Sequence, residues 1–382
     1  MRIVKIEVFH IKVPLKKTYQ LSKVIGTLKY TEPIIVRVFT DEDIVGIGET
    51  DPLVPFTEES PESIKVCLKR YLGPHLIARH IDPTNIVKIH EEMDKLLKQN
   101  LLAKAAIDIA CYDILGKKAK LPIYKLLGGR IRSEIPLSGG IAGGISGGGS
   151  PEDNVKKVLE SVEKGIKTFM IKVGSSTIEE DIATVEVIRK IDEDIHIIVD
   201  ANQGWDSNTA IKFGKSVEKY NIEFLEQPVP YWDIDGLVKI RKSIGIPISV
   251  DEALFTIHDA VRIIEKGAAD IFSIKVAKNG GIYKAKQIIN LAKAFNIKCW
   301  MNTMIEEGIT QAASLQLGMG AENLLELGHS YSSPGRLEED ISTYSDQIHK
   351  AVVRPSEKSG LGIEIKEDVL KKYIIDTFEI DS

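Results

Sequence analysis

The chain has 382 residues, of which 43% are hydrophobic and 27% charged, and this composition excludes a disordered, collagen-like or disulfide-rich protein. Its 50 basic and 55 acidic side chains give a formal net charge of -5, which argues against a protein built around nucleic-acid phosphates. The length fits either two ordinary domains or one large barrel with an appendage.

The amino-terminal half begins with strand patterns and continues with helical ones. Apolar alternation in residues 3–8 and 34–38 predicts a small antiparallel sheet, with a polar loop at 22–30 between its strands. Apolar residues at spacings of three and four in 101–114 predict one buried amphipathic helix. The Leu-Leu-Gly-Gly segment at 126–129 marks a predicted domain boundary.

Beyond this boundary, short β-rich apolar runs alternate with helical segments. Eight alternating units are typical of a (β/α)₈ barrel, and the absence of a shared consensus argues against a solenoid. The eight predicted strands are 134–137, 168–173, 195–200, 222–226, 247–251, 271–276, 298–302 and 324–327.

A glycine-rich stretch at 139–149 follows the first of these runs. Glycines before a helix can bind phosphate, but Glu152 and Asp153 place negative charge at the start of the next helix and would repel it. We therefore expect a flexible barrel loop here. The sequence has neither a secretory signal nor an apolar run of membrane-spanning length, so we expect a cytoplasmic protein that binds neither membranes nor nucleic acid.

Three carboxylates end successive predicted strands. Asp200, Glu226 and Asp251 end strands three, four and five, and the catalytic groups of such barrels come from the carboxyl ends of the strands. One such residue alone would be read as a helix cap or a loop salt bridge. Three together repel one another unless a cation neutralises them, and all-oxygen ligation favours Mg²⁺, with Mn²⁺ as an alternative.

Two lysines flank the predicted metal site. Lys172 ends strand two and Lys275 ends strand six, on opposite sides of the barrel mouth. A divalent cation stabilises the charge that develops when a carbon next to a carboxylate loses its proton. A neutral lysine base requires a pKa lowered from about 10.4 to roughly 7 to 8. Bases on both faces would invert the carbon.

These residues and their neighbours resemble the enolase superfamily, muconate lactonizing enzyme subgroup (mandelate racemase/muconate lactonizing enzyme family). The matching motifs include Gly46-Ile47-Gly48-Glu49, Ile171-Lys172-Val173-Gly174, Val199-Asp200-Ala201-Asn202-Gln203, Glu226-Gln227-Pro228, Val250-Asp251-Glu252-Ala253 and Lys275-Val276-Ala277-Lys278-Asn279-Gly280-Gly281.

The resemblance implies a fold and a set of roles. It implies an α+β capping domain over 1–128, completed by about 356–382, on a modified (β/α)₈ TIM barrel over 129–355, with the loop at 22–30 closing over the substrate. It assigns Mg²⁺ binding to the three carboxylates and acid/base work to the two lysines. The residues expected to bind substrate or to support these groups are Asn202, Glu252, Asn302 and Glu306.

Three departures from the residue patterns of this family narrow the range of reactions that we expect. Met170 stands where members commonly carry the first lysine of Lys-x-Lys, so burial and the metal must account for more of the pKa shift of Lys172. The His-Asp dyad of sugar-acid dehydratases is absent, and so is the Asp-x-Asp pair by which dipeptide epimerases hold an ammonium after strand eight. The run from Met304 to Ile341 is more similar to the N-acylamino acid racemase and o-succinylbenzoate synthase branch, and betaine epimerases also fit.

The sequence thus predicts a Mg²⁺-dependent racemase or epimerase that removes the proton α to a carboxylate through an enolate intermediate. We expect a small-molecule carboxylate substrate, an N-substituted amino acid, and a homo-oligomeric enzyme. The alternatives are a muconate-type cycloisomerase, an o-succinylbenzoate-synthase-like lyase, and a non-catalytic binding or structural homologue. Substrate selectivity is expected to lie in residues 19–30, 52–56 and 329–334.

Overall fold

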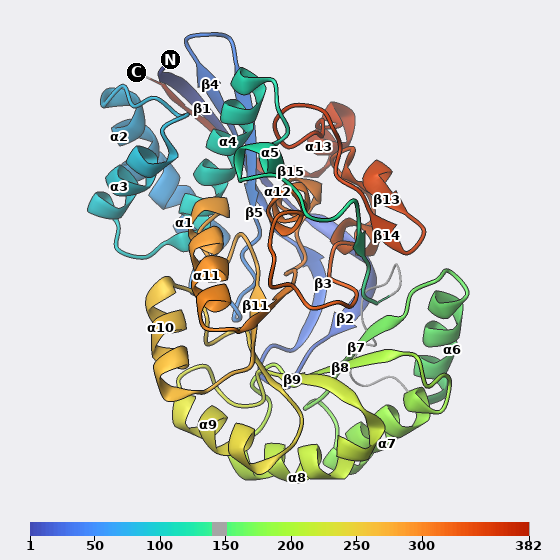
Figure 1. Ribbon diagram of the computed structural model, residues 1–382. Helices are drawn as coiled ribbons and strands as arrows, with labels where there is room; N and C mark the ends of the chain where they lie inside the picture. The colour runs from blue at the N-terminus through green and yellow to red at the C-terminus, as the bar shows by residue number, and fades with distance from the viewer. Residues whose placement is uncertain (140–150, 382) are drawn as a thin grey trace.

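The computed structural model describes residues 1–139 and 151–381. Figure 1 shows a strand-rich unit, which we call the cap, above a second unit in which helices form an outer arc around parallel strands. Most of the predicted glycine-rich loop, residues 140–149, lies outside the described residues. None of the helices within the described ranges has the length and apolar character that crossing a membrane requires.

The cap contains the predicted antiparallel sheet, extended by a strand from the other end of the chain. Its order is β15-β1-β4-β5, and β15 pairs with β1 along most of its length, so both ends of the chain share this sheet (Figure 1). The strands are β1 (Ile3–Ile11), β4 (Ile34–Thr40), β5 (Val45–Thr50) and β15 (Ile374–Asp381).

The prediction of a polar loop over residues 22–30 is wrong for the second half of this range, which forms a strand. Strand β2 (Val13–Gln20) pairs with β3 (Thr27–Thr31), with a register shift between Pro14 and Tyr19, and residues 21–26 form the turn between them. Most side chains of β3 are exposed or half-buried. The strand has only two apolar residues, Leu28 and Tyr30, which alternate with polar ones, and the prediction of a loop did not use this short pattern.

Helix α4 (Leu101–Ala119) occupies the predicted helical segment, but it is buried on all sides over residues 101–114 rather than amphipathic. It lies against β5 so closely that a Cβ on Gly48 would come within 1.9 Å of the Ala106 carbonyl oxygen. The other cap helices are α1 (Pro61–Cys67), the π-helical turn η1 (Leu68–Leu72), α2 (Gly73–Ala78), α3 (Ile86–Leu96) and α5 (Ile123–Leu126).

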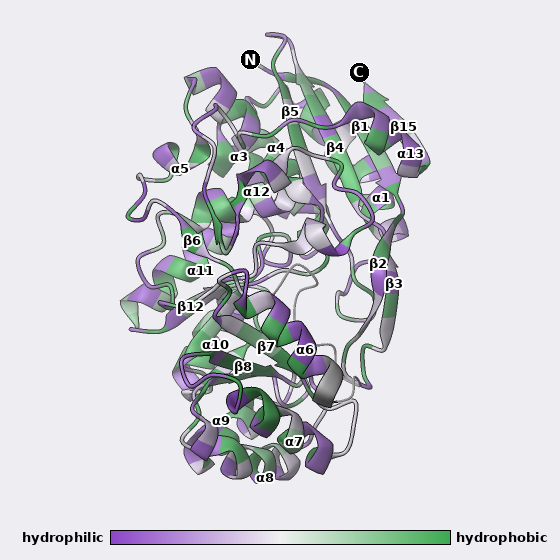
Figure 2. Ribbon diagram, turned by 90° about the vertical axis from the view of Figure 1, so that its right-hand side faces the viewer, coloured by the Kyte–Doolittle hydropathy of each residue, from purple (hydrophilic) through white to green (hydrophobic). Residues whose placement is uncertain are grey.

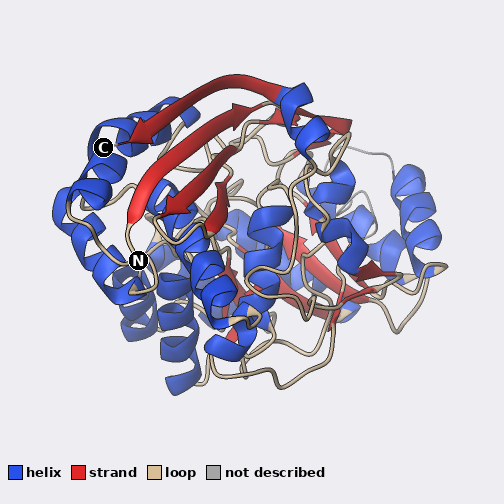
Figure 3. Cartoon of the chain, turned by 90° about the horizontal axis from the view of Figure 1, so that it is seen from above, coloured by secondary structure: helices blue, strands red, loops and turns tan. Residues whose placement is uncertain are grey.

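The second unit is built on six parallel strands in consecutive order. They are β7 (Thr168–Lys172), β8 (His196–Asp200), β9 (Ile222–Glu226), β10 (Ile248–Val250), β11 (Ile271–Ile274) and β12 (Lys298–Met301). The helices that accompany them are α6 (Pro151–Val162), α7 (Ile178–Arg189), α8 (Ser207–Val217) with η2 (Glu218–Tyr220), α9 (Ile234–Ser243), α10 (Ile257–Lys266), α11 (Ile282–Ala294) and α12 (Gly308–Gly318). Seen from above, helices lie around these strands, and the long strands of the cap sheet lie to one side of them in the view (Figure 3).

The first and eighth predicted strands differ from expectation. Residues 324–327 form no strand, and β6 (Ile135–Pro136) pairs with β14 rather than with the parallel sheet. The ring is closed by isolated parallel bridges, Cys299 to Leu324, Leu137 to His329 and Ser138 to Thr168. Two side-chain acceptors add to the main-chain hydrogen bonds at this seam: the Gly328 N–H donates to Thr168 Oγ1 and the Met301 N–H to His329 Nδ1. A modified (β/α)₈ barrel results.

The barrel interior holds a small apolar cluster beneath the strand ends. Figure 2 shows hydrophobic residues along strands of both units, including β4 and β7. The interior cluster consists of Met170, Ile198, Phe224, Ile271, Trp300 and Leu327. The chain ends through η3 (Ser333–Arg336), η4 (Tyr344–Gln347), β13 (Ile348–His349), β14 (Val352–Val353) and α13 (Glu367–Tyr373) before β15.

Candidate active site

Three carboxylates lie side by side at the carboxyl ends of adjacent strands. Asp200 ends β8 and Glu226 ends β9, and the two are direct partners in the strand register. Asp251 follows β10, whose Ser249 is the partner of Glu226. All three residues are completely buried. Because the residues that precede them in each strand are mostly apolar and buried, the carboxylates come together in a region of low dielectric constant.

The two predicted lysines stand on the strands that flank these three. Lys172 ends β7, pairs with Asp200 in the register, and its Nζ contacts Asp200 Oδ2. Lys275 follows β11, and its Nζ lies 2.6 Å from Asp251 Oδ2. The structure thus brings all five predicted residues into one site, with a lysine at either end of the row of carboxylates.

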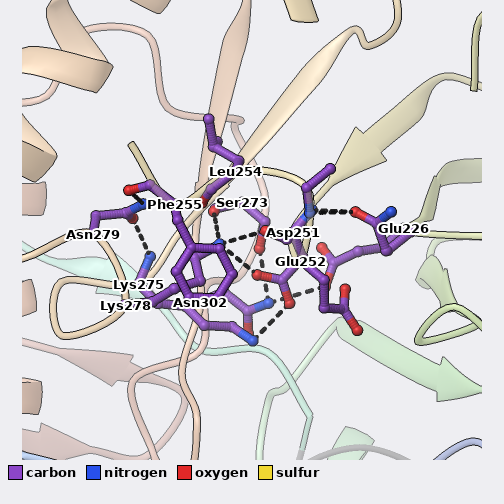
Figure 4. Close-up of polar contacts among 12 residues, drawn as sticks. Glu226, Asp251, Glu252, Leu254, Phe255, Ser273, Lys275, Lys278, Asn279 and Asn302 are labelled. Carbon is purple, nitrogen blue, oxygen red and sulfur yellow. Dashed lines mark hydrogen bonds and ion pairs between the residues drawn. The ribbon is translucent and has the colours of Figure 1, made fainter. Parts of the chain in front are cut away.

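A third lysine, which the sequence motif contained but to which no role was assigned, completes this arrangement. Lys278 is fully buried, and its Nζ lies 2.7 Å from Asp251 Oδ1 and 3.2 Å from the main-chain oxygen of Ser273. Figure 4 shows Lys275 and Lys278 converging on Asp251. The signal in the sequence that could have identified Lys278 is its position three residues after Lys275, in the turn that follows β11.

The carboxylates differ in how well their charges are compensated. Burial raises the pKa of Glu226 well above its usual range, and the charges of Asp200 and Asp251 raise it further. Burial also acts to raise the pKa of Asp251, but Lys275 and Lys278 outweigh it and bring the pKa below its usual range. Negative charge is therefore least compensated in the middle of the row, at Glu226.

The catalytic use of the lysines requires a lower pKa, and the protein's own groups act in the opposite direction. Burial lowers the pKa of Lys172, but Asp200, Tyr19 and Glu226 outweigh it, and the pKa is raised. Burial likewise acts to lower the pKa of Lys275, and Asp251 is the main group that outweighs it and raises that pKa. Each lysine thus serves as counter-ion to a carboxylate, so the lowered pKa expected from the sequence depends on a further positive charge beside those carboxylates.

The donor set fits a hard divalent cation. Three buried carboxylates with little competing nitrogen or sulfur are the ligands that Mg²⁺ prefers. Among the described side chains no three Asp, Glu, His or Cys groups form a ready metal-binding cluster. The reason is local, because Asp200 and Asp251 each direct an oxygen to a lysine. The residues that would hold the cation are Asp200, Glu226 and Asp251.

The predicted supporting residues fall into two groups. Asn302 donates to Glu226 Oε1 at 3.0 Å, and the Asn202 N–H donates to Asp200 Oδ1 at 2.8 Å, so both contact the carboxylates directly. Glu252 accepts a hydrogen bond from Asn202 at 3.2 Å, and burial raises its pKa to about 8. Glu306 accepts one from Gln311 at 2.9 Å instead.

A small cavity lies between the lysines and the cap. Its volume is about 30 Å³, and its lining includes Lys172, Lys275, Asn202 and Asn302 together with Phe56. The Phe56 ring lies 4.1 Å from Lys275 Nζ. Among the described residues, Glu306 and Glu252 do not line it. A neighbouring groove of about 450 Å³ contains Glu252 but neither Lys172 nor Lys275, so the smaller cavity is the candidate site.

Residues of the cap form hydrogen bonds with the barrel residues around this cavity. The Ser22 hydroxyl, in the turn of the β2–β3 hairpin, donates to the Asn202 main-chain oxygen at 2.8 Å. Asp51 accepts from the Ile305 N–H at 3.1 Å and from the Thr31 hydroxyl. Glu49, from the glycine motif of β5, accepts from the Glu307 and Thr310 N–H groups at the start of α12. Cap and barrel therefore form the site jointly.

Comparison with known protein families gives a match for each of the two units of the chain. Residues 4–128 match the family described as mandelate racemase / muconate lactonizing enzyme, N-terminal domain, and residues 153–369 match the family described as enolase C-terminal domain-like.

Three relatives match over most of their length. An N-succinyl-L-Arg/Lys racemase of Bacillus cereus is 35% identical over 98% of each chain, and the crystal structure of such a racemase from that organism superposes with a TM-score of 0.93 at 34% identity over the whole of both chains. A hydrophobic dipeptide epimerase of Enterococcus faecalis is 38% identical over 82% of this chain and 87% of its own. Muconate lactonizing enzyme from Pseudomonas putida has a TM-score of 0.90 at 27% identity, over 98% of this chain and all of its own.

Proposed function

Because this chain belongs to the mandelate racemase / muconate lactonizing enzyme family of the enolase superfamily, we propose that it is a Mg²⁺-dependent racemase or epimerase of N-substituted amino acids. The chain would exchange the proton on the carbon next to the substrate carboxylate. Lys172 and Lys275 would be the two bases, and Asp200, Glu226 and Asp251 the metal ligands.

The observation that carries this proposal is the strand order. Lys172 ends β7 and Lys275 belongs to the turn after β11, and the three carboxylates occupy the ends of the strands β8, β9 and β10 between them. A substrate carboxylate at the row of ligands therefore has an amine on each side. Inversion of a carbon requires two proton-transfer groups on opposite faces, whereas a reaction at one face needs only one.

The residues of the chain divide the work of proton transfer. A bound divalent cation would supply charge stabilisation for the deprotonated substrate. One lysine, as a neutral amine, takes the α-proton, and the other, as an ammonium, returns a proton to the opposite face. In the reverse direction the two exchange roles. Asn302 and Asn202 hold Glu226 and Asp200 in place, and Phe56 covers Lys275 from the cap side.

The class of substrate is supported by the relatives. The Bacillus cereus protein is described as acting on N-succinyl amino acids, and a crystal structure of the Enterococcus faecalis dipeptide epimerase contains Mg and the dipeptide L-Leu-L-Tyr. Both kinds of substrate carry a carboxylate, an exchangeable α-proton and an acylated nitrogen. These shared features define the N-substituted amino acids proposed here.

The test is proton exchange in D₂O. The protein with Mg²⁺ is incubated with a panel of N-acyl amino acids and dipeptides, and deuterium at the α-carbon is followed by NMR together with the optical rotation. We expect deuterium to enter as the rotation falls to zero or to that of the epimeric mixture. A panel in which no substrate gains α-deuterium would refute the proposal.

A muconate-type cycloisomerase is the second candidate, supported by the similarity to muconate lactonizing enzyme over nearly the whole chain. That reaction changes one face of its substrate and needs one lysine. Incubation with cis,cis-muconate, followed by ultraviolet absorbance, distinguishes the two: consumption of muconate without exchange on any amino-acid derivative would favour the cycloisomerase.

A further inference from the structure

One cationic side chain in the catalytic cavity has no acidic partner among residues 1–139 and 151–381. Three cationic residues line the cavity, namely Lys172, Lys275 and Arg336. Both lysines form ion pairs with aspartates. Arg336, in contrast, makes no ion pair or hydrogen bond with its guanidinium within the described ranges, and its Nε is buried without an acceptor. A buried guanidinium N–H group without an acceptor in the protein needs one from a water molecule or from a ligand, and this one lies at a cavity that a ligand can enter.

The cap holds Arg336 in a fixed place. The segment that carries it, η3, lies along β2: Leu15 bridges to Leu337, and the Glu338 N–H donates to the Pro14 oxygen at 2.9 Å. The guanidinium stacks over the Tyr19 ring, 5.0 Å from its centroid. A pre-positioned guanidinium loses little conformational freedom when it binds a ligand.

The order of the strands indicates that Arg336 lies across the barrel mouth from the carboxylates. The ring of the barrel runs from β7 to β12 and closes through residues 324–329 and 137–138, and Arg336 follows this closing segment. Asp200, Glu226 and Asp251 stand on β8 to β10, across the ring from it. The carboxylate on the reacting carbon, which must lie at those ligands, therefore cannot also be the partner of Arg336. Its partner must be at the other end of the substrate.

We propose that Arg336 binds a second carboxylate, carried by the N-acyl group of the substrate. The preferred substrates are then N-acyl amino acids whose acyl chain ends in a carboxylate, and this inference rests on the proposed function. A guanidinium can bind a carboxylate through two parallel hydrogen bonds. The positive charge of a dipeptide's ammonium would instead be repelled at this position, so the same residue would discriminate against dipeptides.

The experiment compares two substrates that differ only at the end of the acyl chain. N-succinyl-L-leucine and N-pentanoyl-L-leucine have acyl chains of similar length, and only the first has the second carboxylate. For the wild-type protein with Mg²⁺ we expect kcat/KM for α-proton exchange to be about 10- to 100-fold higher with the succinyl compound, which corresponds to about 1.4–2.7 kcal/mol. In Arg336→Met the ratio should fall close to one, through a higher KM for the succinyl compound alone.

Two further variants identify the role of the guanidinium. Arg336→Lys keeps the charge but not the paired donors, so it should recover part of the preference. Arg262→Met is the matched control, because Arg262 is exposed in the neighbouring groove and its loss should leave the ratio unchanged. Calorimetric binding of both compounds to the Mg²⁺-loaded protein gives the same comparison without turnover, and also applies to any variant of altered kcat.

The outcomes separate this inference from the proposed function. Exchange on both compounds with no preference in the wild type, or a preference that survives in Arg336→Met, overturns the role of Arg336 and leaves the racemase intact. Absence of exchange on both compounds and on the wider panel overturns the racemase. In that case the role of Arg336 is tested by the calorimetric affinities of the two compounds. Equal affinity for both, or no binding of either, also overturns this inference.

Discussion

Lys278 donates to both the side chain and the main chain of Asp251, with its Nζ 2.7 Å from Oδ1 and 2.7 Å from the main-chain oxygen. Lys275 occupies the other carboxylate oxygen. Lys278 therefore helps to fix the orientation of this proposed metal ligand, and it is fully buried and not among the residues that line the cavity.

Replacement of Lys278 should destabilise the protein strongly. Lys278→Met leaves Asp251 buried with one cation in place of two, and loss of one partner from a buried ion pair costs about 3 kcal/mol or more. We expect a fall of that size in the free energy of unfolding, measured by denaturant titration in a chelator. Added Mg²⁺ should restore part of it, because the cation would take over the compensation of the carboxylate charge.

The matched control is Lys266→Met. Lys266 also pairs with an aspartate, Asp235, at 2.8 Å, but both side chains are exposed, and such pairs contribute less than about 1 kcal/mol. A loss in Lys278→Met no larger than in this control would contradict the role given to Lys278.

Removing the charge of Glu226 should have opposite effects on metal binding and on metal-free stability. In Glu226→Gln the amide can keep the contacts to Asn302 and Ser249 while the least compensated charge disappears. We expect Mg²⁺ affinity, measured by calorimetry, to fall about tenfold or more, and the melting temperature in a chelator to stay the same or rise. Glu223→Gln, on the same strand but half-exposed, is the control; equal Mg²⁺ affinity in both variants would argue against a ligand role for Glu226.

Single lysine variants should separate the two directions of the reaction. In Lys172→Ala and Lys275→Ala, each missing amine removes proton transfer on one face, so interconversion of the enantiomers should fall by several orders of magnitude. Each variant should keep α-proton exchange on one enantiomer only, followed by NMR in D₂O. Exchange on both enantiomers at wild-type rates in either variant would refute the two-base assignment.

Asp51 should make the protein less stable as the pH rises. Burial raises its pKa to about 7, from an ordinary value of 3.8, so ionisation is harder in the folded than in the unfolded state. The folded state therefore loses stability between about pH 4 and pH 7 and does not regain it above that range. Relative to wild type, Asp51→Asn should gain about 3 kcal/mol in unfolding free energy from pH 5 to pH 8.

This prediction is checked by denaturant titration at the two pH values. Asp346→Asn, at an exposed aspartate, should show no such gain. The amide introduced by Asp51→Asn can still accept from the Ile305 N–H and donate to the Thr31 hydroxyl, so the variant keeps both contacts. If it follows the wild-type pH dependence, Asp51 is not the group responsible.

The parts of the fold that could be predicted are those whose residues carry a local pattern. Strands β7 to β12 lie within six of the predicted runs, because strands buried on both faces read as continuous apolar segments. Because Asp200 and Glu226 end successive predicted strands of one parallel sheet, the sequence alone was enough to place them beside each other.

The parts that were missed depend on contacts between distant segments. Most side chains of strands β15 and β3 are exposed, and β15 finds its partner β1 at the other end of the chain. The segment at 324–329 closes the ring through the side chains of Thr168 and His329, which no local pattern reports. Arg336 drew attention only because its guanidinium has no hydrogen-bond or ion-pair partner among the described residues, and a sequence does not show which side chains lack a partner.

The cavity of about 30 Å³ has room for about two water molecules, whereas ligand pockets usually measure about 300–1,000 Å³. The proposed substrates are too large for this space, so their binding would require the cap to move, and a movement of the β2–β3 turn would break the hydrogen bond from Ser22 to Asn202. Turnover would then include a conformational step. The rate of this step falls as solvent viscosity rises, whereas the rates of the proton transfers do not. With the hairpin in place, few water molecules could reach a deprotonated carbon, and in the proposed two-base reaction the lysine that holds the proton would decide the handedness of the product.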